Sequence, residues 1–95
     1  MATTIGLLHL SVSVVQAMNL KDKRRVVKGF KDRVRSAHNV SIAEVDGLDS
    51  IRSAVLAVAM VSNDRRYAEG CLQKIVNAAA GHRDMILVDQ SIEWL

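Results

Sequence analysis

The chain has no proline, one cysteine, and only one each of phenylalanine, tyrosine and tryptophan. A lone cysteine excludes an internal disulfide, so we expect a reducing compartment and a cytoplasmic protein. The RNA-recognition motif stacks bases on strand aromatics, which are missing here. The sequence also lacks a Gly-x-x-Gly clamp of the KH type, a phosphate-binding P-loop and a dinucleotide fingerprint. Any contact with RNA is therefore expected to go to the phosphate backbone.

Metal-binding and membrane-spanning patterns are also missing. His9, His38 and His82 have no spacing that suits a metal, so no metal or cofactor is expected. Residues 1–20 form the longest uncharged stretch, but they begin without basic residues and include Ser11 and Ser13. We therefore expect neither a signal peptide nor a membrane partner.

What the chain does contain is enough apolar sequence for one modest core. Its 95 residues are 49% hydrophobic and 24% charged. This composition excludes a disordered chain and predicts a single domain over residues 1–95.

The spacing of apolar residues alternates between two periods. Period two predicts strands, and steps of three and four predict helices. The predicted order is a strand over residues 4–15, a helix over 20–37, strands over 39–46 and 52–61, a helix over 64–80 and a strand over 85–93. This β-α-β-β-α-β order predicts the α+β class and a ferredoxin-like sandwich, with two helices on one face of a four-stranded antiparallel sheet.

The predicted strands differ in how much of each is buried. The apolar run at residues 54–61 predicts a central strand buried on much of both faces, with a buried helix as the alternative. The first strand would show polar and apolar side chains on the open sheet face, namely Ile5, Leu7, His9, Ser11 and Ser13. A mixed face of this kind suits a dimer interface or a ligand.

Several residues fit the ends and interiors of the helices. Asn19 is a predicted N-cap with Asp22 three residues later, and Ser62-Asn63-Asp64 is predicted to cap the second helix rather than to act in catalysis. Gly81 has the position of a C′ glycine. Cys71 is predicted in the core. Gly29 and Gly70 fall on outer helix faces, where they are either simply tolerated or admit a partner backbone.

Lys23 falls within the apolar stripe of the first helix. Its amine either reaches solvent past the helix end or pairs with a carboxylate of the sheet, Glu44 or Asp46. Both readings are structural, and we favour them over a catalytic lysine.

The positive charge is concentrated in one segment. Residues 21–35 contain eight basic and two acidic residues, whereas the rest contains five basic and eight acidic ones. A solvated helix usually mixes both signs, so this bias favours a nucleic-acid contact over ordinary surface. The predicted contact residues are Lys21, Arg24, Arg25, Lys28, Lys31 and Arg35.

Three segments resemble the YlxP-like family of small bacterial proteins. They are Asn19-Leu-Lys-Asp-Lys-Arg-Arg-Val-Val-Lys28, Asn39-Val-Ser-Ile-Ala-Glu-Val-Asp46 and Val61-Ser-Asn-Asp64. The resemblance implies the same ferredoxin-like fold and an unknown function. Members are often encoded beside translation-initiation and ribosome-maturation factors, which implies a role near the ribosome by association only. Many members carry a tryptophan where this chain has Ile51 and an arginine near Ser53.

Three functions follow as hypotheses. The first is a non-catalytic factor that binds ribosomal RNA or the ribosome through the basic helix. The second is a homodimeric protein-interaction module that uses the open sheet face. The third is a ligand-binding domain or an acylphosphatase-like hydrolase, which is disfavoured because residues 15–19 contain no arginine or glycine.

Overall fold

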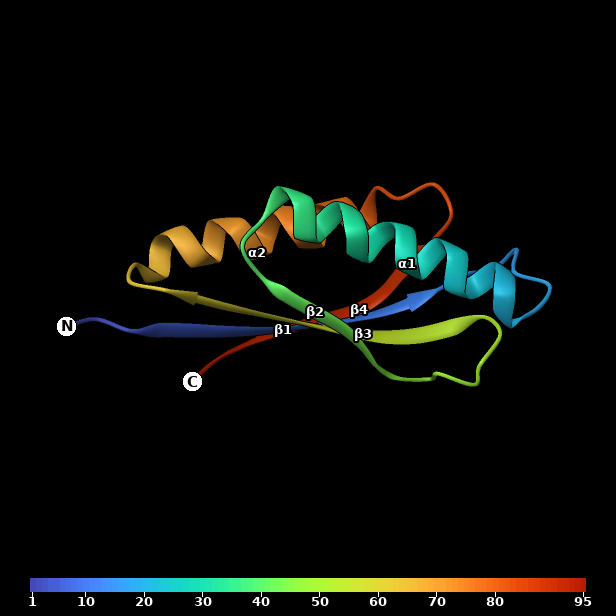
Figure 1. Cartoon of the computed structure of the whole chain (residues 1–95), viewed down its shortest axis with the longest axis horizontal. Helices are drawn as coiled ribbons and strands as arrows, with labels where there is room; N and C mark the ends of the chain where they lie inside the picture. Colours follow the sequence, from blue (N-terminus) through green and yellow to red (C-terminus); the bar gives the residue numbers. More distant parts are fainter.

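The alternating and helical patterns fold into a four-stranded sheet with both helices on one face (Figure 1). The computed structural model describes all residues from 1 to 95. The elements are β1 (Thr4–Ser13), α1 (Leu20–Ala37), β2 (Ser41–Asp46), β3 (Ser53–Ser62), α2 (Arg65–Ala80) and β4 (Ile86–Trp94). The strand order is β2-β3-β1-β4, and every neighbouring pair is antiparallel. The predicted ferredoxin-like α+β sandwich is confirmed.

The helix starts follow from local hydrogen bonds. Asn19 Oδ1 accepts from the Asp22 backbone N–H at 2.9 Å, and the Asp22 carboxylate accepts from the Met18 backbone N–H at 2.9 Å. Asp64 caps α2 by accepting from the Tyr67 backbone N–H at 3.2 Å. The Asn19 and Asp64 contacts satisfy N–H groups that a helix start leaves without a partner, and the Asp22 contact holds the turn just before α1. Both predicted caps are therefore confirmed.

Gly81 ends α2 but does not have the left-handed backbone of a C′ glycine. Its φ is −93°, and the only positive φ in the chain belongs to Gly47, at 76°. Gly47 lies in the turn between β2 and β3, where a positive φ favours glycine. Gly81 was therefore correctly expected at the end of α2, but it is the C-cap residue itself and not a left-handed C′ glycine.

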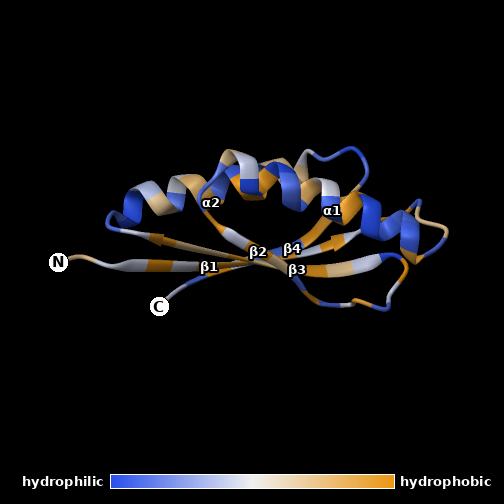
Figure 2. Ribbon diagram, viewed as in Figure 1, coloured by the Kyte–Doolittle hydropathy of each residue, from blue (hydrophilic) through white to orange (hydrophobic).

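The core lies between the helices and the sheet. Twenty buried apolar residues form one cluster, to which both helices and all strands except β4 contribute. Figure 2 shows the hydrophobic residues recurring along the strands beneath the helices. Cys71 is one of the buried residues of α2, as predicted. The two helices thus supply the only cover that the sheet has.

β3 lies inside the sheet, as predicted, but it is buried on one face only. Leu56 and Val58 are fully buried beneath the helices, whereas Ala57 and Ala59 are half-buried and Val61 is 63% exposed. No second layer packs on the other face of the sheet. The prediction of burial on both faces was therefore wrong. The apolar run arises because β3 is an interior strand of the sheet, and helices cover only one of its faces.

The open face has the composition expected from β1. Its five predicted residues, Ile5, Leu7, His9, Ser11 and Ser13, are all half-buried. Across the sheet, Leu7 is paired with Ala59 on one side and Glu93 on the other. The face is therefore partly apolar, with an acidic side chain towards the β4 edge.

Gly6 is the position in β1 where a larger residue has no room. A Cβ atom there would lie 2.8 Å from both Leu72 Cδ1 and Trp94 Cζ3. We expect Gly6→Ala to lower the free energy of unfolding by about 1–3 kcal/mol, because added atoms strain a packed core. Urea denaturation measures this change.

Gly70 provides the matched control for Gly6→Ala. It lies on the exposed side of α2, and a Cβ there would meet no atom within 4 Å. Gly70→Ala is expected to raise stability by about 0.5–1 kcal/mol through helix propensity. Equal effects of the two substitutions would contradict the packing argument.

Candidate functional site

α1 presents two different sides around its buried stripe. Lys23, Val27, Phe30 and Val34 are buried at steps of four, three and four residues, which fixes the helix on the sheet. The remaining surface of α1 is exposed or half-buried. The charged residues of α1 are therefore held on a rigid element, in known positions relative to one another.

The six predicted contact residues do not all lie on one side of α1. At 100° per residue, five of them share one side, and we call them the basic ridge: Lys21, Arg24, Lys28, Lys31 and Arg35. Lys31 is half-buried and the other four are exposed. Arg25 borders this ridge, and with Gly29 and Arg33 it also lines a pocket beside α1. Contact of these six residues with nucleic acid stays a prediction.

Two of the ridge cations are partly neutralised by Asp32. Lys28 Nζ lies 2.7 Å from Asp32 Oδ2, and Arg35 Nη1 lies 3.4 Å from Asp32 Oδ1. The hydrogen bond from Lys28, with the charges of Lys28, Arg35 and Lys31, holds the pKa of Asp32 below its usual range. Arg35 also donates to the Ile42 carbonyl at 3.0 Å, which ties the ridge to β2.

The other three ridge cations have no partner within the chain. Lys21, Arg24 and Lys31 make no side-chain hydrogen bond, and no carboxylate lies within 4.0 Å of them. Like charges on one helix side repel one another by a few tenths of a kcal/mol per pair. Apart from the attraction of Lys31 to Asp32, the fold gains nothing visible from these three charges.

Lys23 is fully buried and holds the sheet to α1. Its ammonium donates to Glu44 Oε2 at 2.9 Å, to the Gly47 carbonyl at 2.7 Å and to the Ser53 carbonyl at 3.2 Å. The predicted structural pair is therefore confirmed with Glu44, not Asp46. The alternative of reaching solvent is wrong, because Lys23 is 0% exposed. All three donors of the ammonium are used, which supports a structural role.

The motif at Ser62-Asn63-Asp64 is also structural. Ser62 Oγ accepts from the Asp64 backbone N–H and donates to the Asp64 carbonyl, both at 3.1 Å. With the Asp64 cap on α2, these bonds stay within the turn.

No cluster of three or more histidine, cysteine, aspartate or glutamate side chains is placed to hold a metal ion. Neither helix has the length and apolar character needed to cross a membrane.

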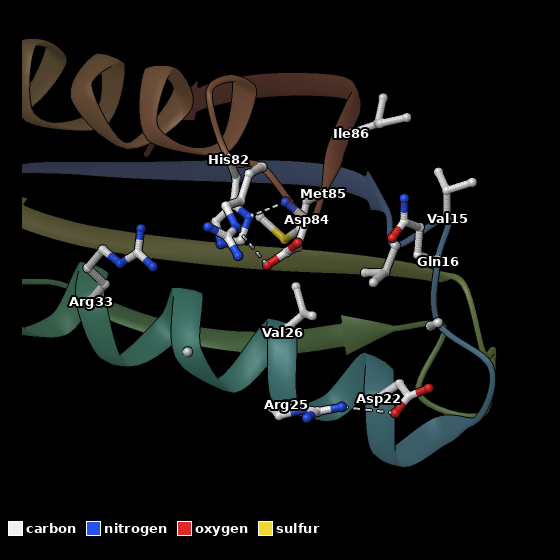
Figure 3. Close-up of a pocket in the computed structure, with 14 residues that line it drawn as sticks. Val15, Gln16, Asp22, Arg25, Val26, Arg33, His82, Asp84, Met85 and Ile86 are labelled. Atoms are coloured by element: carbon white, nitrogen blue, oxygen red, sulfur yellow. Dashed lines mark hydrogen bonds and ion pairs between the residues drawn. The ribbon is translucent and has the colours of Figure 1, made fainter.

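Sequence reasoning missed a pocket on the flank of α1 away from the ridge. It has a volume of about 590 Å³ and lies between α1, the loop at residues 14–17 and the segment at residues 82–86, which leads into β4. Figure 3 shows its labelled side chains, which come from these three segments. Because the segments are far apart in sequence, only their packing brings them together. Gly29, a helical glycine on an outer face, was the one local signal of the pocket.

His82 is held in one orientation at this pocket. Its Nδ1 accepts from the Asp84 backbone N–H at 3.0 Å, and its ring meets the edge of Phe30 with centroids 6.0 Å apart. Burial lowers the pKa of His82, and the positive charge of Arg33 lowers it further. The neutral ring therefore carries its proton on Nε2, which makes that atom a hydrogen-bond donor.

The arginines of the pocket differ in their partners. Arg25 Nη2 lies 3.0 Å from Asp22 Oδ1, and Arg83 Nε lies 3.9 Å from Asp84 Oδ2. The guanidinium of Arg33 has no carboxylate within 4.0 Å. Arg33 is therefore the one arginine here whose charge is unmatched inside the chain.

Comparison with known proteins gives a family match and a fold match. The family model described as "Protein of unknown function (DUF503)" matches residues 5–92. The "Uncharacterized protein YlxP" of Bacillus subtilis (strain 168) is 33% identical over 72 residues, which cover 76% of this chain and 78% of that protein. The solved structure "De novo designed protein Foldit4" superposes with a TM-score of 0.54 at 13% identity, over 98% of this chain and 96% of that one. The last similarity concerns the fold alone.

Proposed function

Because the chain belongs to the DUF503 family, whose function is unknown, we propose a function from its own surface: a non-catalytic protein that binds structured RNA through the basic ridge of α1. The resemblance to the YlxP-like family, seen in the sequence, agrees with this membership. Because members of that family are often encoded beside ribosome-maturation factors, ribosomal RNA is the first RNA to test.

The observation that carries the proposal is the set of three unpaired cations, Lys21, Arg24 and Lys31, on one side of one helix. Their repulsion weakens the helix slightly, and a polyanion relieves it. Each lysine or arginine that meets a phosphate also releases condensed counterions, which favours binding. Because the strands lack the aromatic side chains on which bases could stack, RNA would be bound through its phosphates. The ridge supplies the cations for those contacts.

The length of the ridge suits several phosphates at once. Arg24 and Arg35 are eleven residues apart, which corresponds to about 16 Å along a helix axis. Arg35 is anchored to the Ile42 carbonyl, so this end of the ridge has a fixed position. The proposal is therefore binding to the RNA backbone, with affinity that depends strongly on salt and little on base sequence.

The test compares Arg24→Glu/Lys31→Glu with the wild type for binding to a labelled ribosomal RNA fragment over a range of salt concentrations. We expect the variant to bind at least about tenfold more weakly at low salt. The slope of log K against log salt should fall by about 1.4–1.8, since each lost phosphate contact removes about 0.7–0.9. Fluorescence anisotropy measures both quantities.

The matched control places the same charge change on α2. Arg66 and Lys74 are exposed and, like Arg24 and Lys31, make no ion pair. Arg66→Glu/Lys74→Glu therefore alters net charge equally, and we expect a much smaller loss of affinity. If the two double variants lose affinity equally, only net charge matters, and the ridge is not the site.

A second candidate is a homodimer formed through the open sheet face. It is favoured by the uncovered apolar side chains there, in particular Val61, which is 63% exposed. A dimer would also place two basic ridges in one particle, so the two functions are compatible. Light scattering over a range of protein concentrations separates this candidate from a monomeric RNA-binding protein.

A further inference from the structure

The pocket on the flank of α1 has an apolar end and a cationic end. In Figure 3, Val15 and Ile86 lie at one end, whereas Arg33 and His82 lie at the other, with Val26 and Met85 between them. Its volume of about 590 Å³ is typical of sites for small organic ligands. An occupant that matches both ends has a flat or apolar part and an anionic part.

The cationic end has three donor groups, those of Arg33, Arg83 and His82, and one carboxylate, that of Asp84. Arg33 has no carboxylate within 4.0 Å, and His82 Nε2 carries a proton because Nδ1 accepts from the Asp84 backbone. Arg83 is only loosely tied to Asp84, at 3.9 Å. Two guanidinium groups and an imidazole N–H suit the oxygens of a phosphate, because those oxygens only accept hydrogen bonds.

Gly29 leaves space in the pocket wall that the fold does not need. It lies in the middle of α1, where glycine lowers helix stability by about 1 kcal/mol relative to alanine. A Cβ atom there would meet nothing within 4 Å, so no packing contact requires glycine. Gly70 of α2 has equally open surroundings, so what distinguishes Gly29 is its position in the wall of the pocket. The space beside Gly29 admits a ligand close to the helix backbone.

The side chains between the two ends suit a planar ring. Val26 is half-buried and Met85 is buried, and a thioether makes favourable contacts with aromatic rings. Arg25 lies at the same flank, held by Asp22, and its planar guanidinium is available to stack on a base.

We infer that this pocket binds a nucleotide, with its base over Val26 and Met85 and its phosphate at Arg33 and His82. The same chemistry is offered by a free nucleoside monophosphate and by the phosphorylated end of an RNA strand. The inference goes beyond the proposed function, because it concerns the flank of α1 opposite the basic ridge and does not require the ridge to bind RNA.

The test is titration of the whole protein with each of the four nucleoside 5′-monophosphates, followed by amide NMR shifts and calorimetry. We expect saturable binding of at least one nucleotide, with shifts in residues 25–33 and 82–86. The matching nucleoside and inorganic phosphate alone are expected to bind at least tenfold more weakly. No saturable shift with any nucleotide at millimolar concentration would overturn the inference, and so would inorganic phosphate binding as tightly as the nucleotide.

Gly29→Leu is the decisive variant. It fills the space beside α1 and should not unfold the protein, because leucine favours a helix more than glycine does. We expect nucleotide binding to weaken at least tenfold in Gly29→Leu, and Arg33→Gln to weaken it severalfold. Gly70→Leu, the same change in the open on α2, is the control and should bind as the wild type. Wild-type affinity in Gly29→Leu would show that the pocket is not the site.

Two further arms separate the ligand source and the two proposals. Tenfold tighter binding of an RNA oligonucleotide with a 5′-phosphate than of one with a 5′-hydroxyl identifies the RNA end as the ligand, whereas equal binding identifies the free nucleotide. Arg24→Glu/Lys31→Glu should leave mononucleotide binding unchanged, because those residues lie on the other side of α1. Loss of mononucleotide binding in that variant would contradict the assignment to the pocket.

Discussion

Lys23→Met is expected to lower the free energy of unfolding by about 3–5 kcal/mol, the cost of breaking a buried ion pair by removing one partner. The ammonium of Lys23 is 0% exposed and donates to three acceptors, the Glu44 carboxylate and the carbonyls of Gly47 and Ser53. Methionine has a similar length and no donor. The substitution therefore keeps the packing and leaves all three acceptors without their partner.

Urea denaturation of single and double variants separates the charge pair from the two carbonyl contacts. Glu44 is 13% exposed, so Glu44→Gln leaves Lys23 with a neutral acceptor and is expected to be less harmful than Lys23→Met. Lys23→Met/Glu44→Gln should be more stable than the sum of the two single losses predicts, because the second change no longer breaks an intact pair.

The control for Lys23→Met is the same substitution at Lys31. Lys31 is half-buried on α1 and has no ion pair, so Lys31→Met is expected to change stability by no more than about 0.5 kcal/mol. A Lys23→Met variant that unfolds at the same urea concentration as Lys31→Met would refute the role given to this lysine.

Lys23 also illustrates how far the sequence alone reaches. Its place in the apolar stripe followed from helical period, and a carboxylate partner on the sheet was one of two interpretations. The choice between Glu44 and Asp46 depends on the register of β2, where the pairing with β3 shifts between these two residues. That shift is a property of the assembled sheet, so local periodicity did not contain it.

The helix starts were predictable because their causes are local. Asn19 satisfies an N–H group in the first turn of α1, and Asp22 accepts from Met18 just before the helix, whatever the rest of the chain does. The cover on β3 was not predictable in this way, since it depends on which layers pack against the sheet. An apolar run shows which side chains can be buried. It does not show whether one or both faces of the strand are covered by another layer.

The candidate site was predictable only in part for a similar reason. Charge counts located the basic helix, but only the fold shows that Asp32 is shared by Lys28 and Arg35 and that Arg25 lines a pocket. The pocket forms only where three segments that are far apart in sequence come together, so no single sequence motif predicts it.

Phe30→Ala is expected to lower the free energy of unfolding by about 3–5 kcal/mol, as is typical for a buried phenylalanine. Phe30 is 1% exposed and is the only phenylalanine in the chain. It fills the space between α1 and the sheet, and alanine leaves a cavity there. Thermal or urea unfolding measures the loss, and a loss below 1 kcal/mol would contradict the placement of Phe30 in the core.

Phe30→Leu isolates the contact between the core and the pocket. Leucine fills most of the cavity, so the expected loss is smaller, about 1–2 kcal/mol. The edge contact with the His82 ring, with centroids 6.0 Å apart and planes at 72°, is lost in both variants. An aromatic pair contributes about 0.5–1.5 kcal/mol beyond the area it buries, so removing it frees the His82 ring to reorient. The NMR signals of the His82 ring should therefore shift and broaden in a folded Phe30→Leu protein. Unchanged His82 signals would mean that the backbone bond from Asp84 alone fixes this ring.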